Sequence, residues 1–576
     1  MTAPHSPDSG PAPSAAATSA PRVAPPSGSG DPRPARRFAP SGSEWFAMLL
    51  IVALPLGFGR KWLSMDGDPG RHIRVGETIL RSGLFYRDPF SFTKAGAPFI
   101  PYEWLSEVLT AASVRIAALP GLLVLTGIVL ALAYAVVLRT LWRRGVSPIV
   151  AVPALLLALA MGVLHWLARP HVFTMLGAAL LMVLADRAAG GPRTTSRRDI
   201  WWAAWPALPL FACWANLHGG FLYGLFVLAA IVVGDRLEML SASGAGVAAW
   251  RATLGRHAAL LGAAVCGTLL TPSGPRLYLH TLRYLGDTYL VNGTQEYMSP
   301  DFHVARFSLI AIVVTTAALA VLPRRASFPV IMLVAMNLAF SLMSARNLPL
   351  FGIVVVPLVA PEIERALAVW APGHTPGTGR AGRDPGRLAP GWPILAAIAM
   401  FVLARATSAT VQPPERFAAR SDLFPTTFNP EVFPVRAVSA ARAARVSGRM
   451  FEEFTWGGYV LYAWPEQPVF IDGQTDFYGD AITRDYATIG AVDPGWRQEL
   501  EKWRVDLALL ATVSPLSDAL AHEGGWRPIY CDSTATLFQR DAGHPPALGP
   551  SLAVSASCAS LGIPPRTVAG ATAGTG

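Results

Sequence analysis

The chain has 576 residues, of which 52% are hydrophobic and only 15% are charged. Soluble globular domains contain about a quarter charged residues, so this composition excludes one and indicates a membrane protein. The formal net charge of +10 does not indicate a nucleic-acid partner, because arginines between apolar segments follow from membrane topology. We therefore expect the lipid bilayer as the surroundings of the chain and no nucleic acid as a partner.

The two ends of the chain have the composition of disordered tails. Residues 1–42 are rich in Pro, Ala, Ser and Gly and contain almost no large apolar side chains. Residues 541–576 have a similar composition. Such segments cannot bury enough apolar surface to fold, so both are predicted to be disordered. Because the first apolar run begins only near Trp45, no cleavable signal peptide is expected.

Between the tails, apolar segments dominate residues 43–408. About eleven of them are long enough, or nearly so, to cross a hydrocarbon core of about 30 Å as a helix. They lie at 44–60, 119–138, 148–166, 170–186, 200–216, 219–235, 257–273, 306–322, 328–344, 347–361 and 391–408. The predicted fold class is therefore mainly α, a polytopic membrane protein.

Arginines between the predicted spans orient them. With Arg33, Arg36 and Arg37 of the N-terminal tail in the cytoplasm, the connections on the same side are all basic: Arg139, Arg143 and Arg144; Arg187, Arg193, Arg197 and Arg198; Arg236, Arg251 and Arg256; Arg324 and Arg325; and Arg365, Arg380, Arg383 and Arg387. We therefore expect a multi-pass plasma (inner) membrane protein with a cytoplasmic N-terminus. The first loop, 61–118, and residues 409–540 then lie outside the cytoplasm.

Residues 409–540 are predicted to form a small extracytoplasmic α/β domain. RMFEEF, PVFIDG (which ends in Asp472) and VDLALLA look like strands, and WGGYVLYAW like a helix or a strand. Trp496–Trp503 and Pro515–His522 look helical, and WRPIYCDSTATLFQ looks like a closing hairpin. Cys213 and Cys266 lie in apolar spans and are expected to be packing residues. Cys531 and Cys558 could pair only by joining a folded segment to a tail, so no disulfide framework is implied.

The loop between the first two spans concentrates charged groups that are rare elsewhere. It contains Asp66, Asp68, His72, Glu77, Asp88, Glu103 and Glu107. Acids beside a bilayer are the first place to look for chemistry. Asp68–Ser82 and Trp104–Ala118 are predicted to be amphipathic helices, the first lying on the membrane and the second leading into the second span. The Asp66-Gly67-Asp68 pair could hold a divalent metal through hard oxygen ligands, or could be an ordinary turn.

Further polar residues fall on the same predicted face. They are His165, Arg169, His171, Asn216, His218, Arg276, Glu296, Asp301, Arg346 and Asn347. Each of these residues alone can be explained as a cap of a helix end at the membrane surface, but together they indicate a functional site. Acids facing Arg and His can hold a phosphate and activate a hydroxyl group, because the carboxylate accepts the proton and the cations stabilise the leaving phosphate.

Other motifs carry two interpretations each. Glu103 and Glu107 are one helical turn apart, so both could face the site or form an exposed polar face. Asp472 follows a predicted strand, where it could bind a ligand, but a loop cap or a salt bridge to the membrane domain is favoured. The Trp456-Gly457-Gly458-Tyr459 run is better explained by a tight turn and packing than by stacking on a sugar.

The run DGDPGRHIRVGETIL…DPFSFT…YEWLSEVL resembles a bacterial family of polytopic membrane proteins related to the GT-C glycosyltransferases. LARPHVF, WANLHGGF, LTPSGPRLY, EYMSPDF, SARNLPLF and WGGYVLYAWPEQPVFIDGQTDFYG extend the resemblance over most of residues 45–540. It implies a GT-C-like transmembrane domain over 43–408, and a sugar donor carried on polyprenyl phosphate, as in aminoarabinose transferases and protein mannosyltransferases. It also implies that an acid of the first loop acts as catalytic base or metal ligand.

The positions that match this acidic motif are Asp66 and Asp68. Asp68 is favoured because it directly precedes the helix that bears His72. The chain departs from the family in one respect, since Gly67 and Pro69 make the site turn-like where many relatives have adjacent acids. That departure leaves the choice between Asp66 and Asp68 open.

The leading hypothesis is a membrane glycosyltransferase that moves a sugar from a polyprenyl-phosphate donor to an envelope lipid, glycan or protein acceptor. Asp68 or Asp66 would be the catalytic base, or both would bind a divalent metal ion. The expected substrate-binding residues are His72, Glu103, His165, Arg169, His171, Asn216, His218 and Arg346. The alternatives are a lipid-glycan transporter or flippase, and a non-catalytic GT-C-like scaffold. Transport predicts charged residues along a path through the membrane, whereas the polar non-arginine residues here gather on one side.

Overall fold

A computed structural model describes residues 40–190, 196–241, 247–320, 326–370, 391–409, 423–541 and Cys558. The predicted disordered tails lie almost entirely outside these residues. So do six arginines of the predicted cytoplasmic connections, namely Arg193, Arg324, Arg325, Arg380, Arg383 and Arg387.

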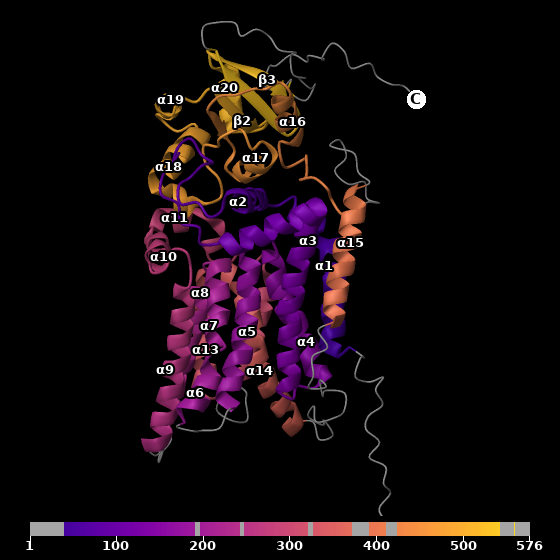
Figure 1. The fold of residues 1–576 in the computed structure, drawn as a ribbon, viewed down its shortest axis with the longest axis vertical. Helices are drawn as coiled ribbons and strands as arrows, with labels where there is room; N and C mark the ends of the chain where they lie inside the picture. The colour runs from indigo at the N-terminus through magenta and orange to yellow at the C-terminus, as the bar shows by residue number, and fades with distance from the viewer. Residues whose placement is uncertain are drawn as a thin grey trace, which may run out of the picture. The chain divides into compact units, whose positions relative to one another are not determined.

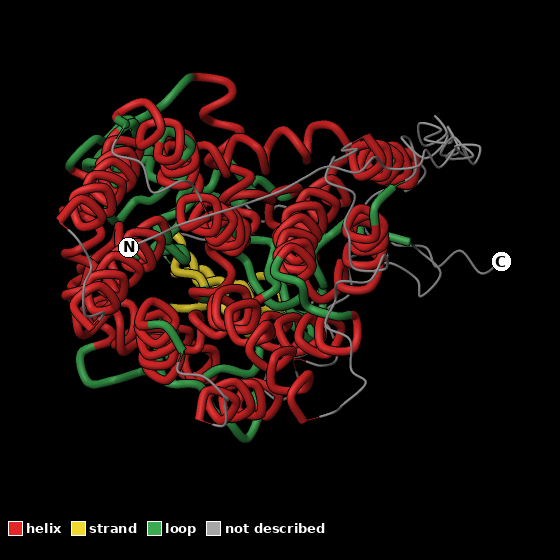
Figure 2. Tube along the Cα trace, turned by 90° about the horizontal axis from the view of Figure 1, so that it is seen from below, coloured by secondary structure: helices red, strands yellow, loops and turns green. Residues whose placement is uncertain are grey.

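Each predicted span coincides with helix. The helices of the apolar part are α1 (Gly42–Trp62), α3 (Trp104–Arg143), α4 (Pro148–Gly162) followed by η2 (Val163–His165), α5 (His171–Gly190), α6 (Arg197–Ala204), α7 (Ala207–Leu217), α8 (Phe221–Ser241), α9 (Val247–Leu269), α12 (Arg306–Ala320), α13 (Phe328–Met343), α14 (Leu348–Trp370) and α15 (Gly391–Ala409). Figure 1 shows them in side view and Figure 2 close to end-on.

Within the described residues, five helices are long and apolar enough to cross a membrane: α1, α3, α4 with η2, α5 and α15. This confirms a mainly helical chain with helices apolar enough to span a membrane, while the number of about eleven spans stays a prediction. The predicted span 200–216 is divided between α6 and α7 at Trp205 and Pro206. A proline has no backbone N–H to donate within a helix, which accounts for a break at this position.

Helix α3 joins the predicted amphipathic segment and the second span across a kink. Ala117 and Ala118 have non-helical backbone angles, and Ala118 has a φ of 51°. Pro120 follows directly and cannot donate to the preceding turn, so the sequence itself explains the kink. The part before the kink therefore has a different direction from the part that enters the apolar helices.

Helix α2 (Asp68–Ser82) has the predicted bounds. It does not lie free on a membrane surface, however, because it packs between α3 and α17 (Gly457–Ala463). Figure 1 shows α2 between the apolar helices and the C-terminal elements. Arg71, His72 and Ile73 are buried in this position. The prediction of a surface-lying helix is wrong because the C-terminal part of the chain covers it.

The C-terminal part contains a four-stranded sheet in the order β1-β2-β4-β3. Its strands are β1 (Met450–Glu452), β2 (Leu507–Ala511), β3 (Trp526–Cys531) and β4 (Ala535–Arg540). β1 runs parallel to β2, and β4 runs antiparallel to both β2 and β3, with Phe451 opposite Ala508 and Leu509 opposite Leu537. The helices of this part are α16 (Val435–Ala443), α17, α18 (Thr475–Gly490), α19 (Trp496–Lys502) and α20 (Pro515–His522). The predicted hairpin, α19 and α20 are confirmed.

The predicted strand PVFIDG is wrong as a member of the sheet. Its backbone N–H groups at Phe470 and Ile471 donate to the carboxylate of Glu452, at 2.9 and 3.0 Å. Val469 pairs instead with the first loop, since its N–H donates to Phe90 O and its carbonyl accepts from Phe92 N, both at 3.1 Å. A buried side chain and the first loop thus satisfy the groups that a neighbouring strand would otherwise use.

One cluster of buried apolar side chains runs through both parts of the chain. It includes Leu123 of α3, Ile73 of α2, Tyr459 of α17 and Leu537 of β4. The chain from Pro40 onward also clusters as one compact unit. A separately folding domain over 409–540 therefore stays a prediction.

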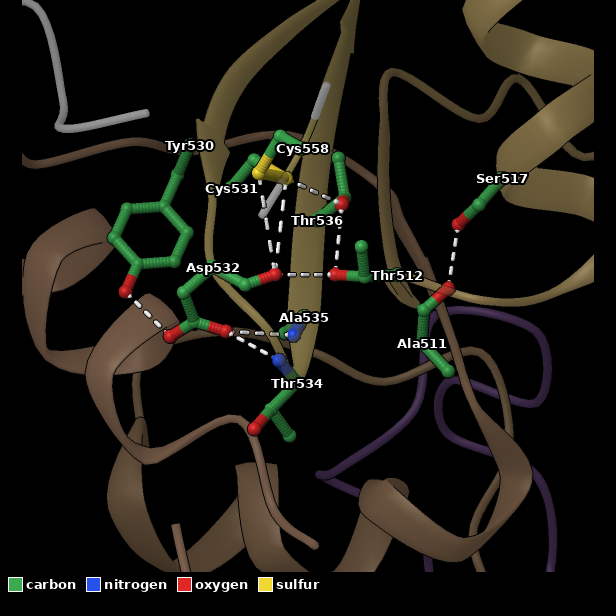
Figure 3. The surroundings of a disulfide bond; sticks show 10 residues. All are labelled: Ala511, Thr512, Ser517, Tyr530, Cys531, Asp532, Thr534, Ala535, Thr536 and Cys558. Carbon is green, nitrogen blue, oxygen red and sulfur yellow. Dashed lines mark hydrogen bonds between the residues drawn. A yellow bond between two sulfur atoms is a disulfide. The ribbon is translucent and has the colours of Figure 1, made fainter. Parts of the chain in front are cut away.

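The cysteines differ from expectation. Cys531 and Cys558 form a disulfide bond that joins β3 to a residue of the predicted tail, the one pairing that the sequence left open, so the expectation of no disulfide framework is wrong. Figure 3 shows the bond beside β4, where the Thr536 hydroxyl donates to the Cys531 sulfur at 3.1 Å. Cys213 and Cys266 are free and exposed on the outer sides of their helices rather than packed in the interior.

Candidate functional site

The DGDPG and WGG motifs fit against each other through glycine. A Cβ at Gly70 would lie 2.4 Å from the Gly458 carbonyl oxygen, and a Cβ at Gly458 would lie 2.5 Å from the Gly67 carbonyl oxygen. Since no side chain fits at either position, the backbones of α2 and α17 touch directly. This contact places the first turn of α2, with Asp68, against the C-terminal part.

The acids of the first loop meet Arg169. The Arg169 guanidinium lies 3.2 Å from Asp66 Oδ2, 3.0 Å from Asp68 Oδ2 and 2.7 Å from Glu296 Oε1. These groups come from three connections that are far apart in the sequence. The prediction that they share one face is therefore confirmed. We call Asp66, Asp68, Arg169 and Glu296 the Arg169 cluster.

The acids of the Arg169 cluster differ in pKa. Burial and the neighbouring Asp68 raise the pKa of Asp66 to about 7, although Arg169 opposes the shift. Burial alone would raise the pKa of Glu296, but Arg169 and Arg346 outweigh it and lower that pKa to about 2. Glu296 therefore stays ionised at neutral pH, whereas Asp66 can exchange a proton there.

The position of Asp68 depends on a glycine of the C-terminal part. A Cβ at Gly473 would lie 1.8 Å from Asp68 Oδ1. The carboxylate is thus held between the Gly473 backbone and Arg169, at the first residue of α2. A carboxylate in the first turn of a helix also interacts favourably with the helix dipole.

A second group of charges surrounds Arg71, one turn further along α2. Its guanidinium lies 3.3 Å from Glu107 Oε1 and 3.3 Å from Asp472 Oδ1, and it also donates to Gln474. His72 Nδ1 lies 3.5 Å from the same Glu107 oxygen. Asp472 also accepts from the Gln474 N–H at 2.8 Å, so the favoured interpretation of Asp472 as a loop cap and salt bridge to the membrane part is confirmed. We call Arg71, His72, Glu103, Glu107 and Asp472 the Arg71 cluster.

Glu103 connects this cluster to His218. Glu103 Oε1 lies 3.6 Å from His218 Nε2. The Gly220 N–H donates to His218 Nδ1 at 2.9 Å, so Nδ1 is an acceptor and the ring proton is assigned to Nε2, which faces Glu103. Burial and Glu107 raise the pKa of Glu103 to about 8. Burial and Arg346 lower the pKa of His218 well below its usual value.

His72, Glu103 and Glu107 form the group of described residues whose geometry could hold a metal ion, with one ligand atom from each lying within 4.8 Å of the others. This is not the metal pair that the sequence predicted. Asp66 and Asp68 instead form ion pairs with Arg169. The Arg169 guanidinium therefore takes the place that the predicted metal ion would have between the two carboxylates.

The remaining predicted residues divide between the site and its framework. Asn216 is structural, since its amide donates to Leu270 O at 2.9 Å and its oxygen accepts from the Trp104 indole at 2.5 Å. His171 Nε2 lies 2.6 Å from the His165 carbonyl oxygen and fixes that turn. Arg346 lies 4.6 Å from the centre of the Tyr297 ring. Three further residues named from the sequence are outside the site: Arg276 and Asp301 are exposed, and Asn347 caps Phe340.

Sequence reasoning missed Arg71, Gly473 and Tyr297. Arg71 is adjacent to His72 in the acidic loop, and this adjacency was the available signal. Gly473 carried no signal, because its role depends on Asp68, 405 positions earlier in the chain.

No protein-family model matches the chain, and no curated protein matches it in sequence. Among solved structures it is similar to the oligosaccharyltransferase AglB from Archaeoglobus fulgidus in complex with an inhibitory peptide and a dolichol-phosphate, with 13% identity and a TM-score of 0.46 over 88% of this chain and 74% of that one. It is also similar to ArnT from Cupriavidus metallidurans bound to undecaprenyl phosphate, with 14% identity and a TM-score of 0.44 over 86% of this chain and 98% of that one. With TM-scores of 0.46 and 0.44, these similarities decide neither family nor activity.

Proposed function

We propose that the chain is a membrane glycosyltransferase that moves a sugar from a polyprenyl-phosphate donor to a hydroxyl group of an envelope lipid, glycan or protein. One observation carries the proposal: carboxylates from two separate connections converge on Arg169, which lies in a third, in a chain with helices long and apolar enough to span a membrane. Such a site brings a proton acceptor and a cation together, as transfer of a sugar from a lipid-linked phosphate requires. The lipid-phosphate donor itself follows from the resemblance of the sequence motifs.

In the simplest step, the acceptor hydroxyl oxygen attacks the anomeric carbon of the sugar. The new C–O bond forms as the bond between that carbon and the phosphate oxygen breaks, and the hydroxyl proton passes to a carboxylate. Asp66 suits this role, because its pKa of about 7 lies close to working pH and its Oδ2, although 3.2 Å from Arg169, accepts no hydrogen bond from the described residues. This favours Asp66 as the base. The sequence alone had favoured Asp68, because Asp68 directly precedes the helix that bears His72.

The leaving phosphate needs cations. Arg346 is the first candidate, because it contacts the Tyr297 ring and forms no ion pair with a carboxylate of the described residues. His165 Nδ1 is buried without a hydrogen-bond partner among the described residues. Burial favours the neutral form of this imidazole, so at neutral pH the ring can donate a hydrogen bond to the phosphate but brings no charge. Arg169 can add to this group by exchanging one carboxylate for a phosphate oxygen.

The orientation of the site also belongs to the proposal. Disulfides persist in oxidising compartments, and Cys531 pairs with Cys558. Together with the basic connections on the opposite side, this supports a location of the C-terminal part and of the Arg169 cluster outside the cytoplasm, in a plasma (inner) membrane protein.

The proposal is tested by mass spectrometry of extracytoplasmic glycans and glycolipids. The strains are the wild type, a deletion, and the deletion complemented with the Asp66→Asn/Asp68→Asn variant or with Asp301→Asn, a matched change at an exposed acid. We expect a defined sugar mass to be absent from the deletion and from the double variant but present with Asp301→Asn, at equal protein amounts. Full rescue by the double variant would favour transport or a scaffold instead.

A further inference from the structure

The Arg71 cluster contains a group of ligand atoms that the proposed transfer step does not use. His72 lies on α2, while Glu103 precedes α3 and Glu107 lies in its first turn. Residues four apart on a helix face the same way, so both glutamates point toward α2. One atom each from His72, Glu103 and Glu107 lie within 4.8 Å of one another.

Two of these groups are buried and only partly satisfied. His72 is 6% exposed and Glu107 is 2% exposed. Within the described part of the chain, His72 Nδ1 and Glu107 Oε2 have no hydrogen-bond partner. Buried polar atoms are nearly always paired, because leaving one unpaired costs the full desolvation of the group. A ligand between α2 and α3 would satisfy both atoms at once.

The charges around these atoms are unbalanced. Glu103, Glu107 and Asp472 bring three carboxylates, and the guanidinium that contacts two of them is Arg71. Arg71 lies against Glu107 Oε1, which leaves Oε2 free for another cation. Burial of surplus negative charge is costly unless a positive group compensates it. Without a metal, a proton on Glu103 relieves part of this charge, because burial and Glu107 raise the pKa of Glu103 to about 8. A divalent ion bound through Glu103 and Glu107 would replace that proton.

We propose that His72, Glu103 and Glu107 bind a divalent transition-metal ion, with Zn²⁺ the best fit. Mg²⁺ and Ca²⁺ prefer sites made only of oxygen atoms, whereas one imidazole and two carboxylates suit Zn²⁺. Among ions that accept such a mixed set, Mn²⁺ binds more weakly than Zn²⁺. Three protein ligands leave a position for water or for an oxygen of a substrate. The ion would also fix α2 against the start of α3, and this role is independent of the proposed transfer reaction.

The test uses the full chain, purified in detergent without a histidine tag, stripped with EDTA and then loaded with Zn²⁺. Metal is measured per chain by inductively coupled plasma mass spectrometry, and unfolding is followed by a thermal shift. We expect one Zn²⁺ per wild-type chain and a higher unfolding temperature after loading. Glu103→Gln and His72→Gln are expected to lower bound Zn²⁺ at least tenfold. Glu103→Gln is the decisive variant, because Glu103 forms no ion pair with an arginine among the described residues and its loss does not unbalance Arg71.

Asp301→Asn is the matched control and is expected to bind Zn²⁺ as the wild type does. Asp66→Asn/Asp68→Asn is also expected to keep the ion, and this variant separates failure of the metal site from failure of the transferase proposal. The inference is overturned if the wild type binds neither Zn²⁺ nor Mn²⁺, or if Glu103→Gln and His72→Gln bind as much as the wild type. It is also overturned if the ion is lost only from the Asp66→Asn/Asp68→Asn variant.

Discussion

The first turn of α2 contributes to two charge clusters of opposite character. In the Arg169 cluster, each acid contacts the guanidinium directly, within 2.7–3.2 Å. In the Arg71 cluster, Glu107 and His72 retain buried atoms without a hydrogen-bond partner, and Glu103 has only His218 within ion-pair distance among the described residues. The comparison indicates two different roles. The Arg169 cluster already contains its cation and offers a proton acceptor, whereas the Arg71 cluster has more carboxylates than cations.

The clusters also differ in what holds them in place. Arg169 joins connections between apolar helices to the first loop, so it depends on the membrane part. Arg71 joins α2 to Asp472 and Gln474 of the C-terminal part. The C-terminal part reaches the Arg169 cluster mainly through the backbone at Gly473, against Asp68. Changes to each of these connections should therefore affect the two clusters to different degrees.

The largest effect is expected from Arg169→Gln. It leaves three acids without their shared cation, and removing one partner of a buried ion pair costs about 3–5 kcal/mol. We expect loss of the sugar product by at least a hundredfold and a lower unfolding temperature, while Zn²⁺ binding at the Arg71 cluster is retained. Glycan mass spectrometry, thermal unfolding and metal analysis check the three parts. Arg276→Gln, at an exposed arginine, is the control, and an equal loss there would contradict the assignment.

A smaller effect is expected from Gly473→Ala. The new Cβ would lie 1.8 Å from Asp68 Oδ1, so the carboxylate must move away while the fold adjusts around a flexible side chain. We expect product formation to fall about tenfold or more, because small displacements in a reacting site are costly, with the unfolding temperature nearly unchanged. Gly524→Ala, where the Cβ would meet nothing within 4 Å, should behave as the wild type. Unchanged product with Gly473→Ala would mean that the position of Asp68 is unimportant.

The dependence of product formation on pH sharpens the comparison further. Asp66 must be ionised to accept a proton, and its pKa is raised to about 7. The active fraction therefore increases with pH, by about tenfold between pH 6 and pH 8 for a single group of this pKa. Initial rates in membranes that contain the protein would show this rise, and the rise should disappear from the residual activity of Asp66→Asn. A rate that falls over this range would exclude Asp66 as the base.

The smallest effect on the product is expected from Cys558→Ser. The described neighbours of the disulfide, among them Thr512, Asp532 and Thr536, belong to neither cluster. Loss of a disulfide typically costs about 2–4 kcal/mol of stability, so the unfolding temperature should fall while product formation changes less than twofold. Thiol labelling of the unfolded wild type, with and without reductant, would verify the bond. Free Cys531 and Cys558 in the isolated wild type would contradict both the bond and the proposed compartment.

Local sequence patterns predicted much of the fold because the relevant forces act over short distances. The bounds of α2 follow from Gly67, Pro69 and Gly83, which start and stop a helix. The apolar segments are helical because a helix pairs its own backbone N–H and C=O groups, which a membrane cannot do. Membrane topology then predicted that Asp66, Asp68 and Arg169 share one face, and their contacts agree with this.

What the sequence could not show depends on contacts between distant residues. PVFIDG has the composition of a strand, yet Glu452 accepts its N–H groups and keeps it out of the sheet. The ion pair of Arg71 with Asp472 joins residues about 400 positions apart, and the sequence around either residue does not predict it. The metal-binding geometry of His72, Glu103 and Glu107 likewise appears only once α2 packs on α3.

The central claim is that a carboxylate of the Arg169 cluster accepts the proton of the acceptor hydroxyl group. The most direct measurement is the amount of the sugar product missing from the deletion strain, in a strain that carries only Asp66→Asn at matched protein amount. The substitution keeps the size of the side chain and removes its ability to accept a proton, so we predict a fall of about a hundredfold or more. Product at the wild-type amount, with Asp68→Asn equally active, would contradict the account.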